Sequence, residues 1–136
     1  MIHVFCKERG SGKTKALINL ANSKLEIAKG NLVYIDDDTR AILEVNKNIR
    51  FICSEDFNIH NYKDFYGFIC GIISKDYDTE AIFIDGILND ACKSEKEMLF
   101  LLSKLEYLVE KFNVNFYINI NCNETEIPEE IKKYVA

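Results

Sequence analysis

Proline, glycine and repeated segments are scarce in this sequence. One proline and six glycines occur in 136 residues, and no stretch rich in Gly, Ser or Pro separates one region from another. A chain of this length in which 48% of the residues are hydrophobic can bury one core and is too short for two ordinary domains. We therefore expect residues 1–136 to form a single domain.

Long apolar runs and an excess of positive charge are missing as well. The longest apolar stretches, such as residues 68–73, are far shorter than the roughly 20 residues that a membrane span needs, and the first residues do not have the pattern of a signal peptide. We expect a cytoplasmic protein with no membrane span. The net charge of −5 disfavours nucleic acid as a partner, because nucleic-acid binding depends on clustered Lys and Arg.

The cysteine pattern of a zinc site or of a disulfide framework is also absent. Five cysteines occur, at positions 6, 53, 70, 92 and 122. They form no Cys-x-x-Cys pair, their number is odd, and only two histidines accompany them. We expect reduced and mostly buried cysteines, since free cysteine is commonly buried.

The sequence does contain an alternation of short apolar runs and segments with helical spacing. Strands are predicted at residues 2–6, 32–35, 49–53, 81–85 and 114–120. Helices are predicted from residue 15 to a C-cap at Gly30, around residues 40–45, and at residues 61–73, 95–112 and 129–135. This order implies right-handed crossovers and an α/β fold, with a five-stranded, mostly parallel sheet covered by helices on both faces.

A glycine-rich loop, Gly10-Ser11-Gly12-Lys13-Thr14, stands between the first predicted strand and the first predicted helix. Phosphate binding needs several backbone N–H groups that point inward, which requires conformations that glycine tolerates best, and a helix N-terminus that favours negative charge. Lys13 would reach the outer phosphates and the Thr14 hydroxyl would bind Mg²⁺. Arg9 and Lys15 flank the loop and complete the predicted nucleotide-binding set.

This segment resembles the Walker A motif, G-x-x-x-x-G-K-[ST], of the P-loop NTPases, which implies ATP or another NTP as the ligand, with Mg²⁺. Lys7 stands where the motif has its first glycine. That glycine mainly helps the chain leave the strand, whereas Gly12, Lys13 and Thr14 would contact phosphate. The alternative is a chance Gly-Lys-Thr at a helix start. ATP is the default nucleotide, because the sequence has no Asn-Lys-x-Asp motif for reading guanine.

A second element of P-loop proteins is an apolar strand that ends in Asp. The sequence Ile-Phe-Ile-Asp at residues 82–85 resembles this Walker B pattern. Bound Mg²⁺ keeps much of its hydration shell, so Asp85 and the Thr14 hydroxyl would be a sufficient contribution from the protein. The alternative is an aspartate that only caps the end of a strand.

The carboxylate that would activate water is not next to Asp85, where many ATPases have Glu, because Gly86 follows. RecA-like ATPases carry this carboxylate just beyond the second strand, where this chain has Asp36, Asp37 and Asp38. Ligands of open α/β sheets bind at this edge, so Asp36 or Asp37 could orient the attacking water. Alternatively, the three acids form a solvated turn, with Asp38 as the N-cap of a following helix.

Three arginines and two asparagines are further candidates. Arg9 lies inside the loop, and Arg40 or Arg50 could act as a finger supplied in trans, although each is more often an ordinary surface residue. Asn119 and Asn121 end the last predicted strand, where related ATPases have a polar sensor of the γ-phosphate. Asparagine near a strand end is also ordinary turn chemistry.

Longer patterns resemble two groups of P-loop proteins. Asp38-Thr39-Arg40 and Ile84-Asp85 resemble the RecA-like core of one type of thymidine kinase, but the similarity ends at Gly86, and the zinc-ribbon cysteines are missing. Nearly the whole chain is similar to small bacterial ATP-binding proteins that are sometimes labelled twitching-motility-type ATPases. That similarity runs through K-E-R-G-S-G-K-T, Y-I-D-D-D-T-R, F-Y-G-F-I-C-G-I-I, I-F-I-D-G-I-L and I-P-E-E-I-K-K-Y. A RecA-like strand order implies that strand 114–120 lies between the first strand and strand 81–85.

These patterns leave three functions open. The first is slow, Mg²⁺-dependent NTP hydrolysis that uses the phosphate loop, Asp85 and a carboxylate from residues 36–38. The second is a non-hydrolysing, nucleotide-dependent interaction module. The third is a small-molecule kinase of the nucleoside type, ranked last because the chain has little material for a lid or an acceptor site.

The predicted helix at residues 61–73 has apolar residues on most of its surface. Such a helix is either buried or in contact with another subunit. Tyr62, Phe65 and Phe68 are therefore candidates for contact with a protein partner or a second copy of the chain.

Overall fold

The computed structural model describes residues 1–136, except for the side chain of Glu124. Its five strands are β1 (Ile2–Lys7), β2 (Asn31–Asp36), β3 (Arg50–Cys53), β4 (Thr79–Ile84) and β5 (Asn115–Asn121). All neighbouring strands are parallel, and their order is β1-β5-β4-β2-β3. The predicted α/β class and five-stranded sheet are confirmed, and β5 lies between β1 and β4 as predicted.

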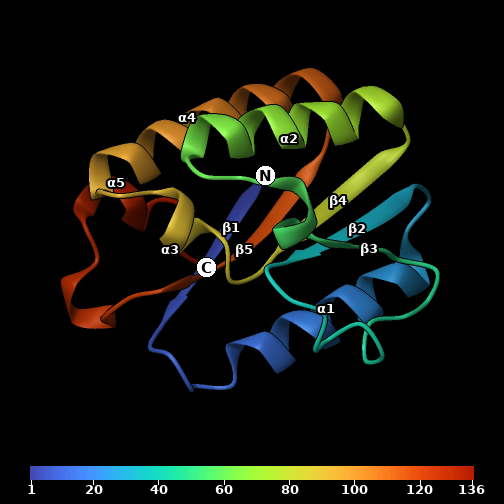
Figure 1. Ribbon diagram of the computed structural model, residues 1–136, viewed down its shortest axis with the longest axis horizontal. Coiled ribbons are helices and arrows are strands. Elements are labelled where there is room, and N and C mark those ends of the chain that lie inside the picture. The colour runs from blue at the N-terminus through green and yellow to red at the C-terminus, as the bar shows by residue number, and fades with distance from the viewer.

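Helices connect these strands and cover both faces of the sheet. The α-helices are α1 (Lys13–Ile27), α2 (Tyr62–Lys75), α3 (Leu88–Ala91), α4 (Glu95–Phe112) and α5 (Glu129–Lys132), and two short 3₁₀ helices are η1 (Ser54–Phe57) and η2 (Glu124–Glu126). Figure 1 shows α2 and α4 side by side on one face and α1 on the other. Of the helices described, none has both the length and the apolar character that crossing a membrane requires.

The strands are apolar on both sides because both faces of the sheet are covered. In β4, Ile82 and Ile84 lie in the core under α2 and α4, whereas Ala81 and Phe83 lie in the smaller core under α1. Successive side chains of a strand point to opposite faces, so a continuous apolar run serves two cores at once. This is why residues 81–84 read as an unbroken hydrophobic stretch.

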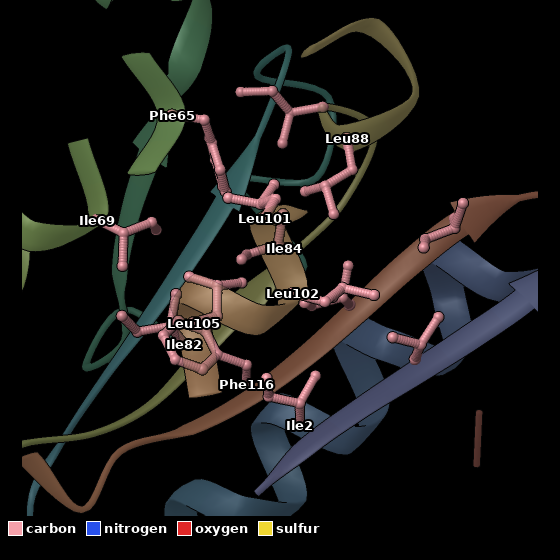
Figure 2. Packing of buried hydrophobic residues seen from close by; sticks show 14 of the residues in the cluster. Ile2, Phe65, Ile69, Ile82, Ile84, Leu88, Leu101, Leu102, Leu105 and Phe116 are labelled. Atoms are coloured by element: carbon pink, nitrogen blue, oxygen red, sulfur yellow. The ribbon is translucent and has the colours of Figure 1, made fainter. Parts of the chain in front are cut away.

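The larger core is the contact between the α2–α4 layer and the centre of the sheet. Ile69 from α2 and Leu105 from α4 pack beside Ile82 of β4 and Phe116 of β5 (Figure 2). All four side chains are fully buried. This core extends across β1, β5 and β4 and therefore fixes the relative positions of their ends, which carry polar residues.

Phe65 belongs to this core, and its predicted role in contact with a partner is wrong. Its side chain is 0% exposed and points from α2 towards the sheet (Figure 2). Residues 65, 69 and 73 recur every four positions and form the buried stripe of the helix. Tyr62 and Phe68 are only half-buried, so these two remain candidates for an outer contact.

Two predicted features of the connecting segments are wrong. Residues 39–45 form hydrogen-bonded turns rather than a helix, so Asp38 does not cap a helix there. The helix α1 ends at Ile27 with Ala28 as its C-cap, and Gly30 is not in the left-handed conformation. Gly30 is required for a different reason, since it lies directly against the backbone of Asp78.

The end of the chain lies along the outer edge of the sheet. The helix α5 is shorter than predicted and ends at Lys132. After it, the Val4 N–H donates to the Tyr134 carbonyl (2.8 Å) and the Ala136 N–H donates to the Val4 carbonyl (2.9 Å). These bonds cover part of the β1 edge, which would otherwise present unpaired backbone groups.

The cysteine prediction is wrong for two of the five residues. Cys6 near the end of β1 and Cys122 just after β5 form a disulfide, with their Cα atoms 5.5 Å apart. Cys53, Cys70 and Cys92 are free. The pair is 116 residues apart in the sequence and is brought together only by the pairing of β1 with β5, so residue spacing could not reveal it.

The close approach at Gly30 gives a test of the fold. A Cβ atom at this position would collide with the backbone oxygen of Asp78, so Gly30→Ala should lower the free energy of unfolding by about 1 to 3 kcal/mol. Gly67→Ala is the matched control, because nothing lies within 4 Å of a Cβ atom at that position. Since Gly67 lies in the interior of α2, this change should raise the free energy of unfolding by about 0.5 to 1 kcal/mol. Urea denaturation measures both changes, and equal stability of the two variants would contradict this packing.

Candidate functional site

A cavity of about 520 Å³ lies at the carboxyl ends of the strands. Its lining includes residues from the loop after β1, the end of β2, the turn after β4 and the end of β5. In a parallel sheet these ends all meet at one edge, and this is where open α/β sheets bind ligands. Most of the site residues that the sequence predicts lie at this edge, where the fold brings them around one cavity.

The loop after β1 has the backbone conformation that the glycines were expected to provide. Gly10 and Gly12 have φ angles of 82° and 83°, in the left-handed region that favours glycine. Gly12 is the N-cap of α1, no described side chain caps this end, and the first turn contains no acidic residue. The N–H groups and the helix dipole at Lys13 and Thr14 are therefore available to an anion.

Asn119 connects this helix start to Asp85. Its side-chain amide donates to the carbonyl oxygen of Lys13 (3.0 Å) and to Oδ1 of Asp85 (3.3 Å). Asn119 is 2% exposed and Asp85 is 4% exposed, so both side chains have fixed surroundings. The sequence left open whether Asn119 is a sensor of the γ-phosphate or ordinary turn chemistry. In the structure, Asn119 joins the end of β5 to the residue after β4 and to the start of α1.

Tyr34 was not predicted as part of the site. Its hydroxyl donates to the other carboxylate oxygen of Asp85 (3.5 Å), and its ring is fully buried in β2. Burial, reinforced by the nearby Asp85 carboxylate, raises the pKa of the Tyr34 hydroxyl above its ordinary value, so this group stays protonated and remains a donor. The sequence signal is weak, because a tyrosine in an apolar run ordinarily indicates core.

The three aspartates after β2 form a cluster whose carboxylate oxygens lie within 4.8 Å of one another. Asp36 is 6% exposed, and Asp37 and Asp38 are half-buried. Burial, a hydrogen bond with Asp37 and the charge of Asp85 raise the pKa of Asp36 to about 8. The raised pKa favours the protonated form of Asp36, and a cation in the cluster would oppose this effect.

Gly86 and Asp37 fit each other closely. Gly86 follows Asp85, has a φ angle of 78° and is half-buried. A Cβ atom at Gly86 would lie 2.7 Å from Oδ1 of Asp37. The carboxylate of Asp37 therefore occupies the space that a side chain at position 86 would need.

Asp38 and Arg40 form a pair at the rim of the cavity. The guanidinium of Arg40 lies 2.7 Å from Oδ2 of Asp38, and the Arg40 backbone N–H donates to Oδ1 (2.9 Å). These hydrogen bonds lower the pKa of Asp38 below its ordinary value. The Arg40 side chain is 90% exposed, and exposed ion pairs stabilise proteins little, so the pair serves mainly to shape the turn.

Negative charge exceeds positive charge in the cavity. The lining carboxylates belong to Asp36, Asp37, Asp38, Glu44, Asp85 and Asp90, whereas the cationic side chains are those of Arg9, Lys13 and Arg40. Carboxylate and hydroxyl oxygens are the donors that hard cations such as Mg²⁺ prefer, and the Thr14 hydroxyl also lines the cavity. The residues present thus fit a divalent cation.

The remaining predicted residues are placed less centrally. Ser11 lines a smaller neighbouring pocket of about 280 Å³, and the exposed Lys15 lines neither of these two cavities. Arg50 begins β3, so it lies towards the opposite end of the strands. Asn121 lines the main cavity, and its side-chain oxygen has no partner among the described residues.

Asn89 was missed by sequence reasoning. It lies in the short helix α3, and it exchanges two hydrogen bonds with the backbone of Asn121, at 2.9 Å and 2.8 Å. These bonds fix the segment after Asp85 against the end of β5. A four-residue helix has no periodicity to detect, and one exposed asparagine carries no sequence signal of its own.

No protein-family model matches this chain, and no curated protein matches its sequence. Its function must therefore be inferred from the cavity and its side chains.

Asp36 predicts how stability depends on pH. Its pKa is about 8 in the folded protein and near 3.8 ordinarily, so the folded state binds the extra proton between these values and stability should fall as pH rises from 4 to 8. Without divalent cations, Asp36→Asn should make the free energy of unfolding less dependent on pH and should raise it by roughly 2 to 4 kcal/mol at pH 8. Urea denaturation from pH 4 to 9 measures it, with Asp38→Asn as the control. Parallel profiles for the wild type and Asp36→Asn would contradict the buried, protonated carboxyl.

Proposed function

We propose that this chain is a P-loop protein that binds ATP or another NTP with Mg²⁺ and hydrolyses it slowly. The observation that carries the proposal is the bridge made by Asn119 between the Lys13 carbonyl and the Asp85 carboxylate. The bridge joins the two segments that resemble Walker A and Walker B motifs, although they are far apart in the sequence. Parallel strand ends meet at one edge in any such sheet, so the specific support is the direct hydrogen bonding of Asn119 to both segments.

The phosphates would lie over the start of α1. There the uncapped N–H groups of the first turn and the ammonium of Lys13 favour negative charge. Lys7 does not weaken this arrangement. It is the last residue of β1, it pairs with Asn121 in register, and its carbonyl accepts a hydrogen bond from the Cys122 N–H (3.0 Å). Position 7 is thus an ordinary strand residue with no need for glycine.

The Thr14 hydroxyl and Asp85 would hold Mg²⁺ beside the phosphates. Bound Mg²⁺ would neutralise charge on the phosphate oxygens. Asn119 and Tyr34 each donate to one oxygen of Asp85, so the carboxylate is held in one orientation. A fixed carboxylate pays less ordering entropy on binding than a mobile one.

Asp37 is the residue best suited to orient the attacking water. It is half-buried, it lines the cavity, and its carboxylate lies against Gly86, next to Asp85. Asp36 is less suited, because it is only 6% exposed and is therefore less accessible to a bound water than Asp37. In the proposed step, water attacks the γ-phosphorus, its proton passes to the Asp37 carboxylate, and the bond to the diphosphate breaks.

A non-hydrolysing interaction module is the second candidate. The turn that follows Asp38 and Arg40 presents Leu43, which is 95% exposed, and Ile42, which is 47% exposed. Apolar side chains at the tip of a turn beside the ligand cavity could contact a partner when nucleotide is bound. A phosphate-release rate below about 10⁻³ s⁻¹, the scale of an unassisted GTPase, would favour this module over the enzyme.

Lys13 provides the test of nucleotide binding. Lys13→Ala should weaken MgATP binding at least tenfold, roughly what one charge-assisted hydrogen bond contributes. Lys15→Ala is the matched control, because it removes a neighbouring ammonium outside the cavity and keeps the backbone N–H. Isothermal titration calorimetry measures the MgATP affinity of both variants. Equal affinity of the wild type and Lys13→Ala would contradict the P-loop proposal.

Asp37 provides the test of hydrolysis. Asp37→Asn should reduce phosphate release by about 10² to 10⁴, the usual range for general acid–base catalysis, while MgATP affinity stays within about threefold. Asp38→Asn should keep turnover, because Asp38 is bonded to Arg40 at the rim. If Asp37→Asn keeps the turnover of the wild type, another residue orients the attacking water. If the wild type shows no turnover, the proposed hydrolysis is wrong and the non-hydrolysing interaction module remains.

A further inference from the structure

The disulfide between Cys6 and Cys122 lies at the root of the phosphate loop. Cys6 is the last residue but one of β1, and residues 8–12 of the loop begin just after Lys7. Cys122 follows β5, and its N–H donates to the Lys7 carbonyl (3.0 Å). The covalent bond and this hydrogen bond together join the start of the loop to β5, the strand that also carries Asn119.

One cysteine of the pair is more exposed than the other. Cys6 is 8% exposed, whereas Cys122 is half-buried and lines a pocket of about 310 Å³ together with Cys6, Cys92 and Lys93. Thiol–disulfide exchange needs a thiolate to reach one sulfur of the bond. Because Cys122 is the more exposed residue of the pair, we expect a small thiol to attack its sulfur first.

The third cysteine of this pocket does not compete for the bond. Burial, with the nearby Glu97 carboxylate, raises the pKa of the Cys92 thiol to about 12. A thiol that stays protonated is a poor nucleophile. Exchange at Cys122 therefore depends on a thiol from solution.

The thiol pocket shares a wall with the ligand cavity. Asn89 and Asn121 line both of them, and they are bonded to each other through the backbone of Asn121. Asn121 directly precedes Cys122. The disulfide is thus connected through Asn121 and Asn89 to the wall of the ligand cavity.

We propose that the Cys6–Cys122 disulfide is a reversible redox switch that sets the mobility of residues 8–12 and thereby their affinity for phosphate. The loop-mobility part is independent of nucleotide binding, and the phosphate part rests on the proposed nucleotide binding. In the oxidised form both ends of the cradle are fixed, which lowers the ordering cost of binding. In the reduced form this constraint is lost, and binding weakens.

The exchange is balanced with a small thiol such as glutathione. A thiolate attacks the Cys122 sulfur, the bond to Cys6 breaks, and the Cys6 thiolate leaves and takes a proton. A second thiolate attacks the mixed disulfide and releases Cys122 as a thiolate, which is also protonated. The protein disulfide is reduced to two thiols, and two small thiols are oxidised to one disulfide.

Thiol trapping in glutathione buffers tests the switch. The full chain is equilibrated at graded ratios of reduced to oxidised glutathione, trapped with iodoacetamide and analysed by peptide mass spectrometry. Cys6 and Cys122 should convert together within this range, and Cys70→Ser, which removes a free cysteine from α2, should not change the midpoint. A pair that stays oxidised or stays reduced at every ratio would overturn the proposal.

Hydrogen exchange and calorimetry test the coupling. Amides of residues 8–14 should exchange more slowly in the oxidised wild type than in the reduced one, and MgATP should bind at least about threefold more tightly. Cys122→Ser should match the reduced form under both conditions. Equal loop exchange and equal affinity in the two redox states would overturn the coupling.

These readouts separate the two proposals. If neither redox form binds MgATP, the proposed nucleotide function fails, while thiol trapping and hydrogen exchange still decide whether the disulfide governs the loop. If both forms bind MgATP equally and Lys13→Ala does not bind, the nucleotide function stands and the phosphate part of the switch is wrong.

Discussion

All five strands run in the same direction, and the whole site depends on this constraint. Parallel strands need crossovers, the crossovers contain helices, and the helices bury both faces of the sheet. The carboxyl ends of all strands then meet at one edge, where polar residues can leave the apolar layers without entering the core. Asp36 ends β2, Asp85 directly follows β4 and Asn119 lies near the end of β5, so the common strand direction brings all three residues to this edge.

This arrangement has a cost in stability. Asp36 and Asp85 are each less than 7% exposed, and burying carboxylates close together is unfavourable unless they are protonated or paired with a cation. The fold accepts this cost at one place and compensates for it in the two cores. A cation that enters the cluster would relieve the repulsion, so the same groups that strain the free protein would favour the bound one.

The fold was largely predictable from the sequence, and the site was predictable in part. Apolar runs such as residues 81–84 and the helical spacing of residues 95–112 give local signals, and the strand-end rule brings Lys13, Asp36 and Asp85 together. What could not be predicted depends on tertiary neighbours. The burial of Phe65 depends on which side of α2 faces the sheet, and the Cys6–Cys122 bond depends on strand pairing.

The pair formed by Asp37 and Gly86 shows why position in space matters more than position in the sequence. A glycine after Asp85 first suggests a missing carboxylate, since many ATPases have Glu there. In the fold, the carboxylate of Asp37, the residue after β2, lies beside Gly86. It fills the space that a side chain at position 86 would need. Because only glycine leaves this room and accepts a φ of 78°, the two positions depend on each other. The carboxylate beside Gly86 is therefore supplied by the residue that follows β2, and it lines the cavity.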